Sequence, residues 1–363
     1  MTKPLYVGLP LMLHSEPEVI AFRNAQKRIQ ALGDELGQPI QVGAFLFLLP
    51  RALTDENRTK QLENQRKYNI PIIHAQATFQ LRHNLVYSRE QDTSLVGGRD
   101  LLEIALDQVS QLRRGSAQDQ LSLPFHLDYN IGAFVSPEVP AERKVQYVYT
   151  LQEFLAQREE LYQRAKNRFS ELQALAKDEG LEVAVENAIN AVFAPHPALG
   201  GTPQMYYHPF NGLKPLVDVS NGNLVFDSAH WIASRSAVVS FERNGATRER
   251  EILFQTEGVN SWEQYLENNP NFDRYLPFAR VLHMSNATGL GVFLEKYPQD
   301  KARWGDGGEV EGLIPRKDLR TMASHAIEQG KPVIIEVDYD IKEIPKNEFS
   351  EADKFLRYVL QDD

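Results

Sequence analysis

Cysteine is absent from this chain of 363 residues. Its absence excludes disulfide bonds, thiolate zinc sites, iron–sulfur clusters and cysteine nucleophiles. Long apolar runs are also absent, since none reaches the roughly 18 residues that a membrane-spanning helix needs. The N-terminal segment MTKPLYVGLP does not have the layout of a signal peptide. A cytoplasmic protein without membrane association is therefore expected.

Positive charge is scarce as well. The 39 Lys and Arg residues are outnumbered by 49 Asp and Glu residues, which gives a formal net charge of −10. Proteins that bind nucleic acid mainly through its phosphates present a basic face, so nucleic acid is not the expected partner. Low-complexity segments, short repeats and Gly/Ser linkers are lacking too, and 42% of the residues are hydrophobic. One domain with a sizeable core, spanning residues 1–363, is expected.

Short apolar runs recur along the chain. Each is bounded by Gly, Pro, Asn or polar residues, as expected for strands that are buried on both faces. There are eight such runs, at residues 6–13, 41–49, 70–78, 123–130, 181–188, 223–230, 280–286 and 332–338.

The segments between these runs are mostly typical of amphipathic helices. The first helix is expected over 17–36, followed by Gly37 at the position where a glycine ends many helices. Strands that alternate with helices indicate a parallel sheet, and eight such units predict an α/β fold that closes into a (β/α)₈ TIM barrel. An open doubly wound sheet is the alternative, although no Gly-x-Gly-x-x-Gly motif follows the first strand. Further helices are expected over 100–112, 142–177 (as one helix or two), 319–329 (ended by Gly330) and 351–360.

Two connections, 189–222 after strand five and 232–262 after strand six, are unusually long. Asn244 and Gly245 in the second one predict a hairpin turn, and Ser261 with Gln264 predicts the start of a helix. Insertions on this side of a barrel lie over the active site, so both segments are candidate lids or substrate walls. Decoration and a subunit interface are equally open, and a homo-oligomer is compatible with the sequence.

Carboxylates and imidazoles end most of the otherwise apolar strands. Such groups are costly to desolvate unless they are paired or bound to a cation. The carboxyl ends of barrel strands meet on one face, where several carboxylates would repel one another without a metal between them. A single buried histidine is usually a core residue, but ionisable ends on four consecutive strands favour a functional site. The residues at strand ends are His74, His126, Glu186, Asp227 with His230, His283 and Glu336.

These motifs resemble the xylose-isomerase-like barrel superfamily, which includes ketose 3-epimerases, inosose dehydratases and endonuclease IV. The resemblance rests on Glu-Asn after strand five, Asp-x-x-His after strand six, His-x-Ser-Asn after strand seven and Glu in the last strand. Residues 305–309, Gly-Asp-Gly-Gly-Glu, are similar to the glycine loop that those proteins place after strand seven. The resemblance spans residues 5 to 340 and is clearest from Glu186 onward.

The resemblance implies one divalent metal, held by Glu186, Asp227, His283 and Glu336. Oxygen-rich ligation with one imidazole suits Mn²⁺, Mg²⁺ or Co²⁺, with Zn²⁺ as the alternative. Glu186 and Glu336 would also be the catalytic acid and base that move protons to and from the substrate.

The resemblance further implies an isomerase, an epimerase or a related dehydratase that acts on a small sugar, polyol or sugar acid. An endonuclease-like phosphoester hydrolase with several metals is the alternative, but residues 300–304 lack the additional Asp-x-His motif of that branch. A non-catalytic, ligand-binding barrel is the third possibility. The residues expected to contact the substrate are His230, His74, His126 and Trp231.

Overall fold

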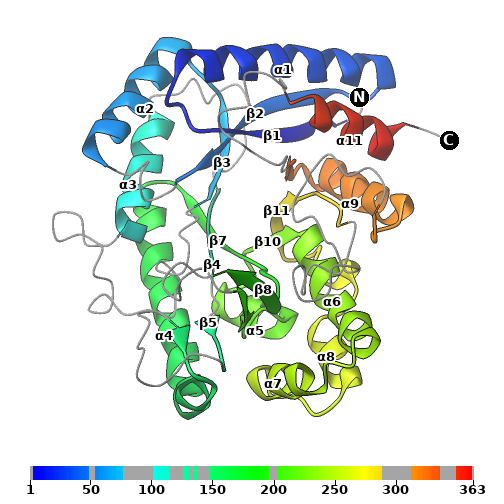
Figure 1. Ribbon diagram of the computed structural model, residues 1–363. Helices are drawn as coiled ribbons and strands as arrows, with labels where there is room; N and C mark the ends of the chain where they lie inside the picture. Colours follow the sequence, from blue (N-terminus) through cyan, green and yellow to red (C-terminus); the bar gives the residue numbers. More distant parts are fainter. Residues whose placement is uncertain are drawn as a thin grey trace.

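The structure is a computed structural model that describes residues 3–48, 54–76, 101–114, 126–130, 134–137, 148–195, 203–287, 312–335 and 349–361. Within them, parallel strands pair side by side in the order β1-β12-β11-β10-β7-β4-β3-β2, and the sheet closes into a barrel (Figure 1). The predicted α/β barrel is confirmed, and the open sheet is wrong. Each strand lies within, or begins one residue before, one of the eight apolar runs: β1 (Leu5–Leu11), β2 (Ile40–Phe47), β3 (Ile72–Gln76), β4 (His126–Asn130), β7 (Glu182–Glu186), β10 (Leu224–Asp227), β11 (Ala279–His283) and β12 (Pro332–Ile334).

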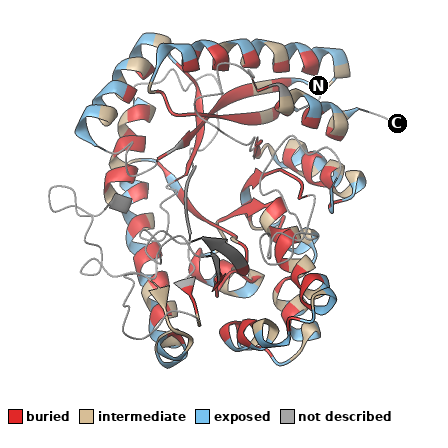
Figure 2. Cartoon of the chain, in the orientation of Figure 1, coloured by how far each residue is buried: buried red, intermediate tan, exposed pale blue. Residues whose placement is uncertain are grey.

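Helices surround this barrel (Figure 1). Figure 2 shows that their buried faces are turned toward the strands and their exposed faces outward. None of the helices that the structure describes is long and apolar enough to cross a membrane. The helices are α1 (Glu16–Leu36), α2 (Asp55–Tyr68), α3 (Leu101–Arg114), α4 (Leu151–Asp178), α5 (Leu213–Val219), α6 (Ser228–Arg243), α7 (Thr247–Glu257), α8 (Trp262–Asn268), the 3₁₀ turn η4 (Phe272–Arg274), α9 (Arg316–Gln329) and α11 (Ser350–Leu360).

Local sequence explains where several helices begin and end. Helix α1 ends where predicted, because Gly37 adopts the left-handed conformation (φ 68°), and α9 ends in the same way at Gly330 (φ 65°). Glycine has no Cβ and adopts this conformation without steric cost. Helix α4 is a single helix that starts with a capping box, in which Thr150 and Glu153 satisfy each other's main-chain N–H groups.

The apolar core has two layers. The larger layer fills the space between the strands and the helices, where Phe22 of α1 and Phe226 of β10 are fully buried. The smaller layer fills the interior of the barrel and consists of Phe45, Ile73, Ala184, Val225, Val281 and Ile334. Because the interior is packed in this way, a ligand is expected above this layer, at the carboxyl ends of the strands.

The segment after β7 forms a second sheet. Strands β8 (Ala191–Pro195) and β9 (Pro203–Tyr207) pair in antiparallel fashion. With β5 (Phe134–Val135) and β6 (Val148–Tyr149) they form a four-stranded sheet in the order β6-β5-β9-β8.

The segment after β10 is helical, and the hairpin predicted at Asn244 and Gly245 is wrong. These two residues join α6 to α7, and Gly245 turns the chain with φ of 58°. Phe241 of α6 and Leu253 of α7 are buried, so the apolar residues that flank the turn serve helix packing and not strand pairing. The helix predicted near Ser261 is present as α8, and Ser261 Oγ accepts a hydrogen bond from the N–H of Gln264.

Candidate metal centre

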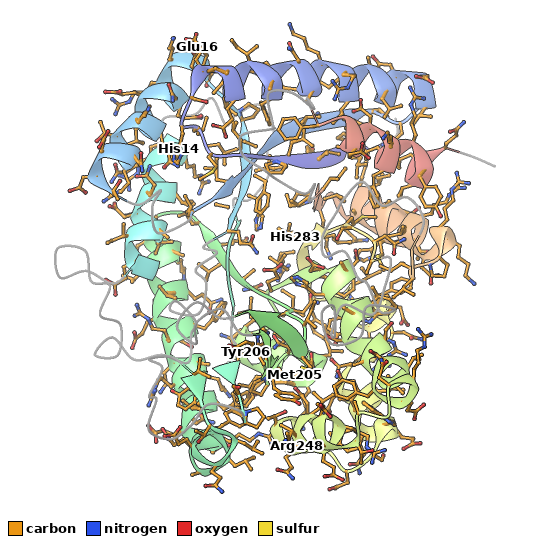
Figure 3. The ribbon with its side chains drawn as sticks, in the orientation of Figure 1. His14, Glu16, Met205, Tyr206, Arg248 and His283 are labelled. Atoms are coloured by element: carbon orange, nitrogen blue, oxygen red, sulfur yellow. The ribbon has the colours of Figure 1, made fainter. Side chains whose placement is uncertain are left out.

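Three polar side chains lie one step beyond the interior apolar layer. In β7, Ala184 belongs to that layer and Glu186 follows two residues later. Asp227 follows Val225 of the layer by two residues in β10. In the same way, His283 follows Val281 in β11. Since side chains alternate along a strand, all three face the barrel interior, and each is at most 2% exposed. Figure 3 shows His283 near the centre of the ring of strands.

Glu186 contacts side chains of two other strands and of helix α6. Its Oε2 accepts a hydrogen bond from Nε2 of Gln76, which is buried in β3. Its Oε1 lies 3.2 Å from Nδ1 of His283 and 3.8 Å from Nδ1 of His230, and accepts no hydrogen bond from the described residues. One carboxylate oxygen is thus held by an amide, while the other faces two imidazoles.

Asp227 connects the end of β10 to the start of α6. Its Oδ1 accepts a hydrogen bond of 2.7 Å from the main-chain N–H of His230, which makes Asp227 the N-cap of the helix. Its Oδ2 lies 3.6 Å from Nδ1 of His230, and that nitrogen is 2.9 Å from the main-chain oxygen of Asn187. The spacing of Asp-x-x-His is therefore explained by one helical turn, which brings both side chains to the same place.

Side chains also tie the strand ends together. Oδ1 of Asn187 accepts a hydrogen bond from the N–H of Asp227 (2.7 Å), and its Nδ2 donates to the Asp227 main-chain oxygen (2.9 Å). Between β10 and β11, Oγ of Ser228 accepts from the N–H of Ser285 (3.0 Å) and donates to its main-chain oxygen (2.7 Å). These bonds continue the strand pairing through side chains and fix the relative positions of the polar residues.

The residues fit a divalent cation. Glu186, Asp227 and His230 each offer one ligand atom, and these atoms all lie within 4.8 Å of one another. Two buried carboxylates so close together repel each other, and a cation between them removes that cost. The Glu186 oxygen without a hydrogen bond is the type of atom that a metal would satisfy.

Three other residues predicted for the site are His74, His126 and Glu336. His74 is fully buried in β3, where its ring stacks on Phe45 at 5.2 Å and meets His283 edge-on at 5.2 Å. His126 lies beside His74 in the pairing of β4 with β3, and its side chain is outside the described residues. Glu336 and the glycine-rich segment 305–309 also lie outside them. Their predicted roles stay predictions.

Trp231 packs in the outer layer of the core. Its ring contacts Phe226 and Phe272, with centroids 6.2 Å and 5.7 Å away, and its Nε1 donates to the main-chain oxygen of Pro270 at 2.9 Å. These contacts account for the residue as part of the packing between α6 and the segment that follows α8. Its predicted place in the substrate pocket stays a prediction.

His208, after β9, is a neighbour of His230 that sequence reasoning missed. Its Nε2 atom is buried, and desolvation together with the charge of His230 lowers the pKa of His208 to about 4. At neutral pH it is therefore uncharged and adds no positive charge that would compete with a cation.

No protein-family model and no curated protein matches this chain. Among solved structures, it is similar to a xylose isomerase domain protein from Planctomyces limnophilus, with 14% identity, a TM-score of 0.46 and coverage of 98% of this chain and 97% of that one. It is also similar to a D-allulose 3-epimerase from Methylomonas sp., with 16% identity, a TM-score of 0.45 and coverage of 99% and 98%. A sugar phosphate isomerase/epimerase from Parabacteroides distasonis ATCC 8503 has 12% identity, a TM-score of 0.45 and coverage of 99% and 94%.

Gln76 is a second site residue that sequence reasoning missed. Replacing it by leucine removes the amide that holds Glu186 and is expected to weaken Mn²⁺ binding by about 10-fold, because residues that orient metal ligands typically contribute 10- to 100-fold to affinity. Calorimetric titration with Mn²⁺ measures this.

Gln65→Leu is the matched control. Gln65 is equally buried, but it donates to the Ile70 main-chain oxygen outside the site. The Gln65→Leu variant should have a lower melting temperature and an unchanged Mn²⁺ affinity. Equal affinities in both variants would contradict the positioning role of Gln76.

Proposed function

We propose that this chain is a divalent-metal-dependent isomerase or epimerase, or a related dehydratase, for a small sugar, polyol or sugar acid. The observation that carries the proposal is the group formed by Glu186, Asp227 and His230, whose ligand atoms lie within 4.8 Å of one another at the carboxyl ends of β7 and β10. Active sites of (β/α)₈ barrels lie at this end of the strands. Two carboxylates with an imidazole favour Mn²⁺, Mg²⁺ or Co²⁺.

Each predicted residue then has a role. A bound divalent ion would supply a Lewis acid that polarises carbonyl and hydroxyl oxygens of the substrate. Glu186 is proposed to take a proton from the carbon next to the carbonyl group, and Glu336, as a protonated carboxyl group, is proposed to return a proton to the opposite face of that carbon. Gln76 holds the Glu186 carboxyl group in place through Oε2.

His283 and His230 are proposed to have different roles at the site. The side chain of His283 is fully buried beside Glu186, which suits a metal ligand. The side chain of His230 is 23% exposed, so a substrate hydroxyl can reach it from the mouth of the barrel. His230 is therefore proposed to contact both the metal centre and the substrate.

The experiment that tests this function is turnover of a panel of ketoses and inososes by protein treated with EDTA, with and without added Mn²⁺. We expect turnover only when Mn²⁺ is present, together with saturable Mn²⁺ binding to the substrate-free protein. Cleavage of abasic DNA with several zinc ions bound per chain would instead establish the hydrolase alternative. An absence of metal binding would favour the non-catalytic barrel.

The proposal also covers the domain organisation, the compartment and the partner of the chain. The chain is proposed to act as one barrel domain over residues 1–363, in the cytoplasm, with a small carbohydrate as its partner. Its oligomeric state stays open.

A further inference from the structure

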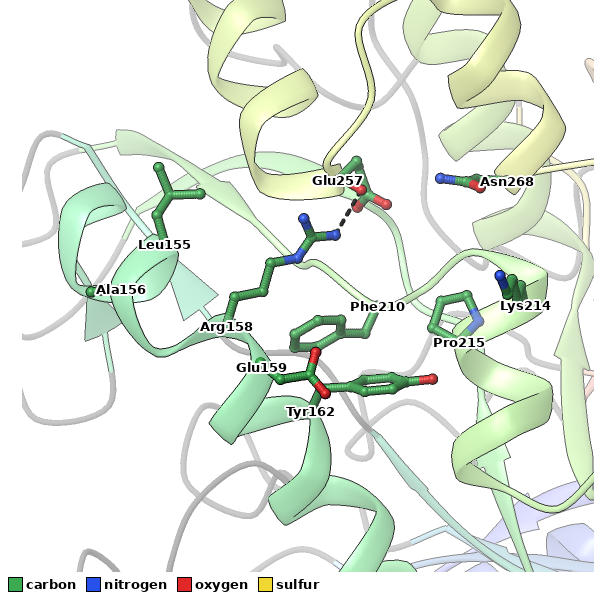
Figure 4. Close-up of a pocket in the computed structure, with 10 residues that line it drawn as sticks. All are labelled: Leu155, Ala156, Arg158, Glu159, Tyr162, Phe210, Lys214, Pro215, Glu257 and Asn268. Atoms are coloured by element: carbon green, nitrogen blue, oxygen red, sulfur yellow. Dashed lines mark hydrogen bonds between the residues drawn. The ribbon is translucent and has the colours of Figure 1, made fainter.

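A cavity whose lining includes none of the metal-centre residues lies between α4, α5 and the C-terminal ends of α7 and α8 (Figure 4). Its volume is about 480 Å³. None of the residues that line it belongs to the metal centre. Those that carry its chemistry are Arg158, Glu159, Tyr162, Phe210, Lys214 and Glu257.

Glu257 is the unusual member of this lining. It is only 6% exposed, and its carboxyl group is hydrogen-bonded to Asn190, while Oε1 has no hydrogen-bond partner among the described residues. Arg158 is its neighbour, but Nη2 of the guanidinium donates to the main-chain oxygen of Glu257, at 2.8 Å, and not to the carboxyl group (Figure 4). A buried carboxyl oxygen left without a donor is unfavourable, and a ligand in the adjoining cavity can supply one.

Burial also changes the charge of this group. It raises the pKa of Glu257 to about 8, against the opposing effects of Arg158 and Asn190. At neutral pH the carboxyl group is therefore mostly protonated, so that it can both donate and accept a hydrogen bond.

Two aromatic rings form another wall. The rings of Tyr162 and Phe210 are 5.3 Å apart. Phe210 has a left-handed backbone conformation, with φ of 71°, which is strained for a residue with a side chain. Strain of this kind is concentrated at ligand-binding positions, and here it occurs in a residue that lines the cavity.

We propose that this cavity is a second binding site, for a small, uncharged, polyhydroxylated molecule such as a free sugar or polyol. Hydroxyl groups both donate and accept, which matches Glu257, Arg158 and the nearby Asn268, and the C–H face of a sugar ring can pack on the aromatic wall.

The test is binding of D-fructose and of myo-inositol to the full chain after EDTA treatment, followed by saturation-transfer NMR and by calorimetry. Removing the metal excludes sugar binding that depends on the metal centre, so failure of the proposed catalytic function does not affect this result. We expect saturable binding in the millimolar range for at least one of the two probes. Glu257→Leu should weaken it about 10-fold, the equivalent of one neutral hydrogen bond.

Glu251→Leu is the matched control, since Glu251 is an exposed glutamate of the same helix. It should bind like the unmodified protein. If Glu257→Leu does not fold, Phe210→Ala takes its place, and it should weaken binding to a similar degree. The proposal is overturned if neither probe binds saturably, or if the cavity variants bind as tightly as the control.

Discussion

Replacing Glu186 by glutamine is expected to weaken Mn²⁺ binding by at least about 100-fold, because residues that merely orient ligands already contribute up to that much. The amide keeps the size of the carboxyl group but removes its charge, beside a second carboxylate and two imidazoles. Turnover of the substrate is expected to fall by about 10²- to 10⁴-fold, the typical contribution of a general acid or base. Calorimetric titration with Mn²⁺ and the sugar panel measure the two effects.

The control for this prediction comes from the same strand. Glu182 is exposed at the start of β7, four residues before Glu186. It precedes Ala184 of the interior apolar layer, whereas Glu186 follows it. Glu182→Gln should retain full Mn²⁺ affinity. Unchanged affinity in the Glu186 variant would show that the strand-end carboxylates do not hold a metal, and the proposed chemistry would fail with it.

Stability against unfolding is expected to decrease between about pH 5 and pH 9 through Glu257. Its pKa is raised from 4.5 to about 8 in the folded protein, so the folded state binds the proton more tightly than the unfolded chain does. The stabilisation is therefore fully present below pH 4.5 and is lost as the pH rises through 8. Since one pKa unit corresponds to about 1.4 kcal/mol, the loss amounts to at most about 5 kcal/mol.

Neighbouring groups do not account for this change. Burial raises the pKa of Tyr275 and that of Tyr265 well above their usual value, so neither phenol ionises over this range. Urea unfolding at pH 5, 7 and 9 should show that Glu257→Gln becomes steadily more stable relative to the unmodified protein as the pH rises. The exposed Glu251→Gln should show no such trend. Parallel pH profiles for both variants would contradict the buried, protonated state of Glu257.

The secondary structure was predictable wherever burial imposes a simple pattern. Strands of a closed barrel are covered on both faces, so they are short apolar runs, and all eight were found. Helix α2 was missed because DENRTKQLENQRKY has no apolar stripe, and the residues it buries are Gln61 and Gln65. Their amides reach the main-chain oxygens of Met12 and Ile70, contacts that no local pattern reveals.

The candidate site was predictable to the extent that it depends on strand ends. Glu186, Asp227, His230 and His283 were singled out because ionisable groups are rare at the end of apolar strands, and the structure brings them together. Gln76 and His208 were missed. A glutamine or histidine near an apolar run is common, and its importance depends on what lies across the barrel from it.

The amino-acid sequence alone therefore determined which segments become strands and which side chains follow the apolar layer into the barrel, since alternation along a strand is a local property. Only the tertiary structure decided which of these side chains meet. Gln76 and Glu186 are 110 residues apart in the sequence, and their side chains touch. Gln76 pairs with Asp128 of β4, and Asp128 pairs with Ala184 of β7, so the end of β3 comes within two residues of Glu186 in register. That registration arises from the packing of the whole barrel, and for this reason no short motif encodes it.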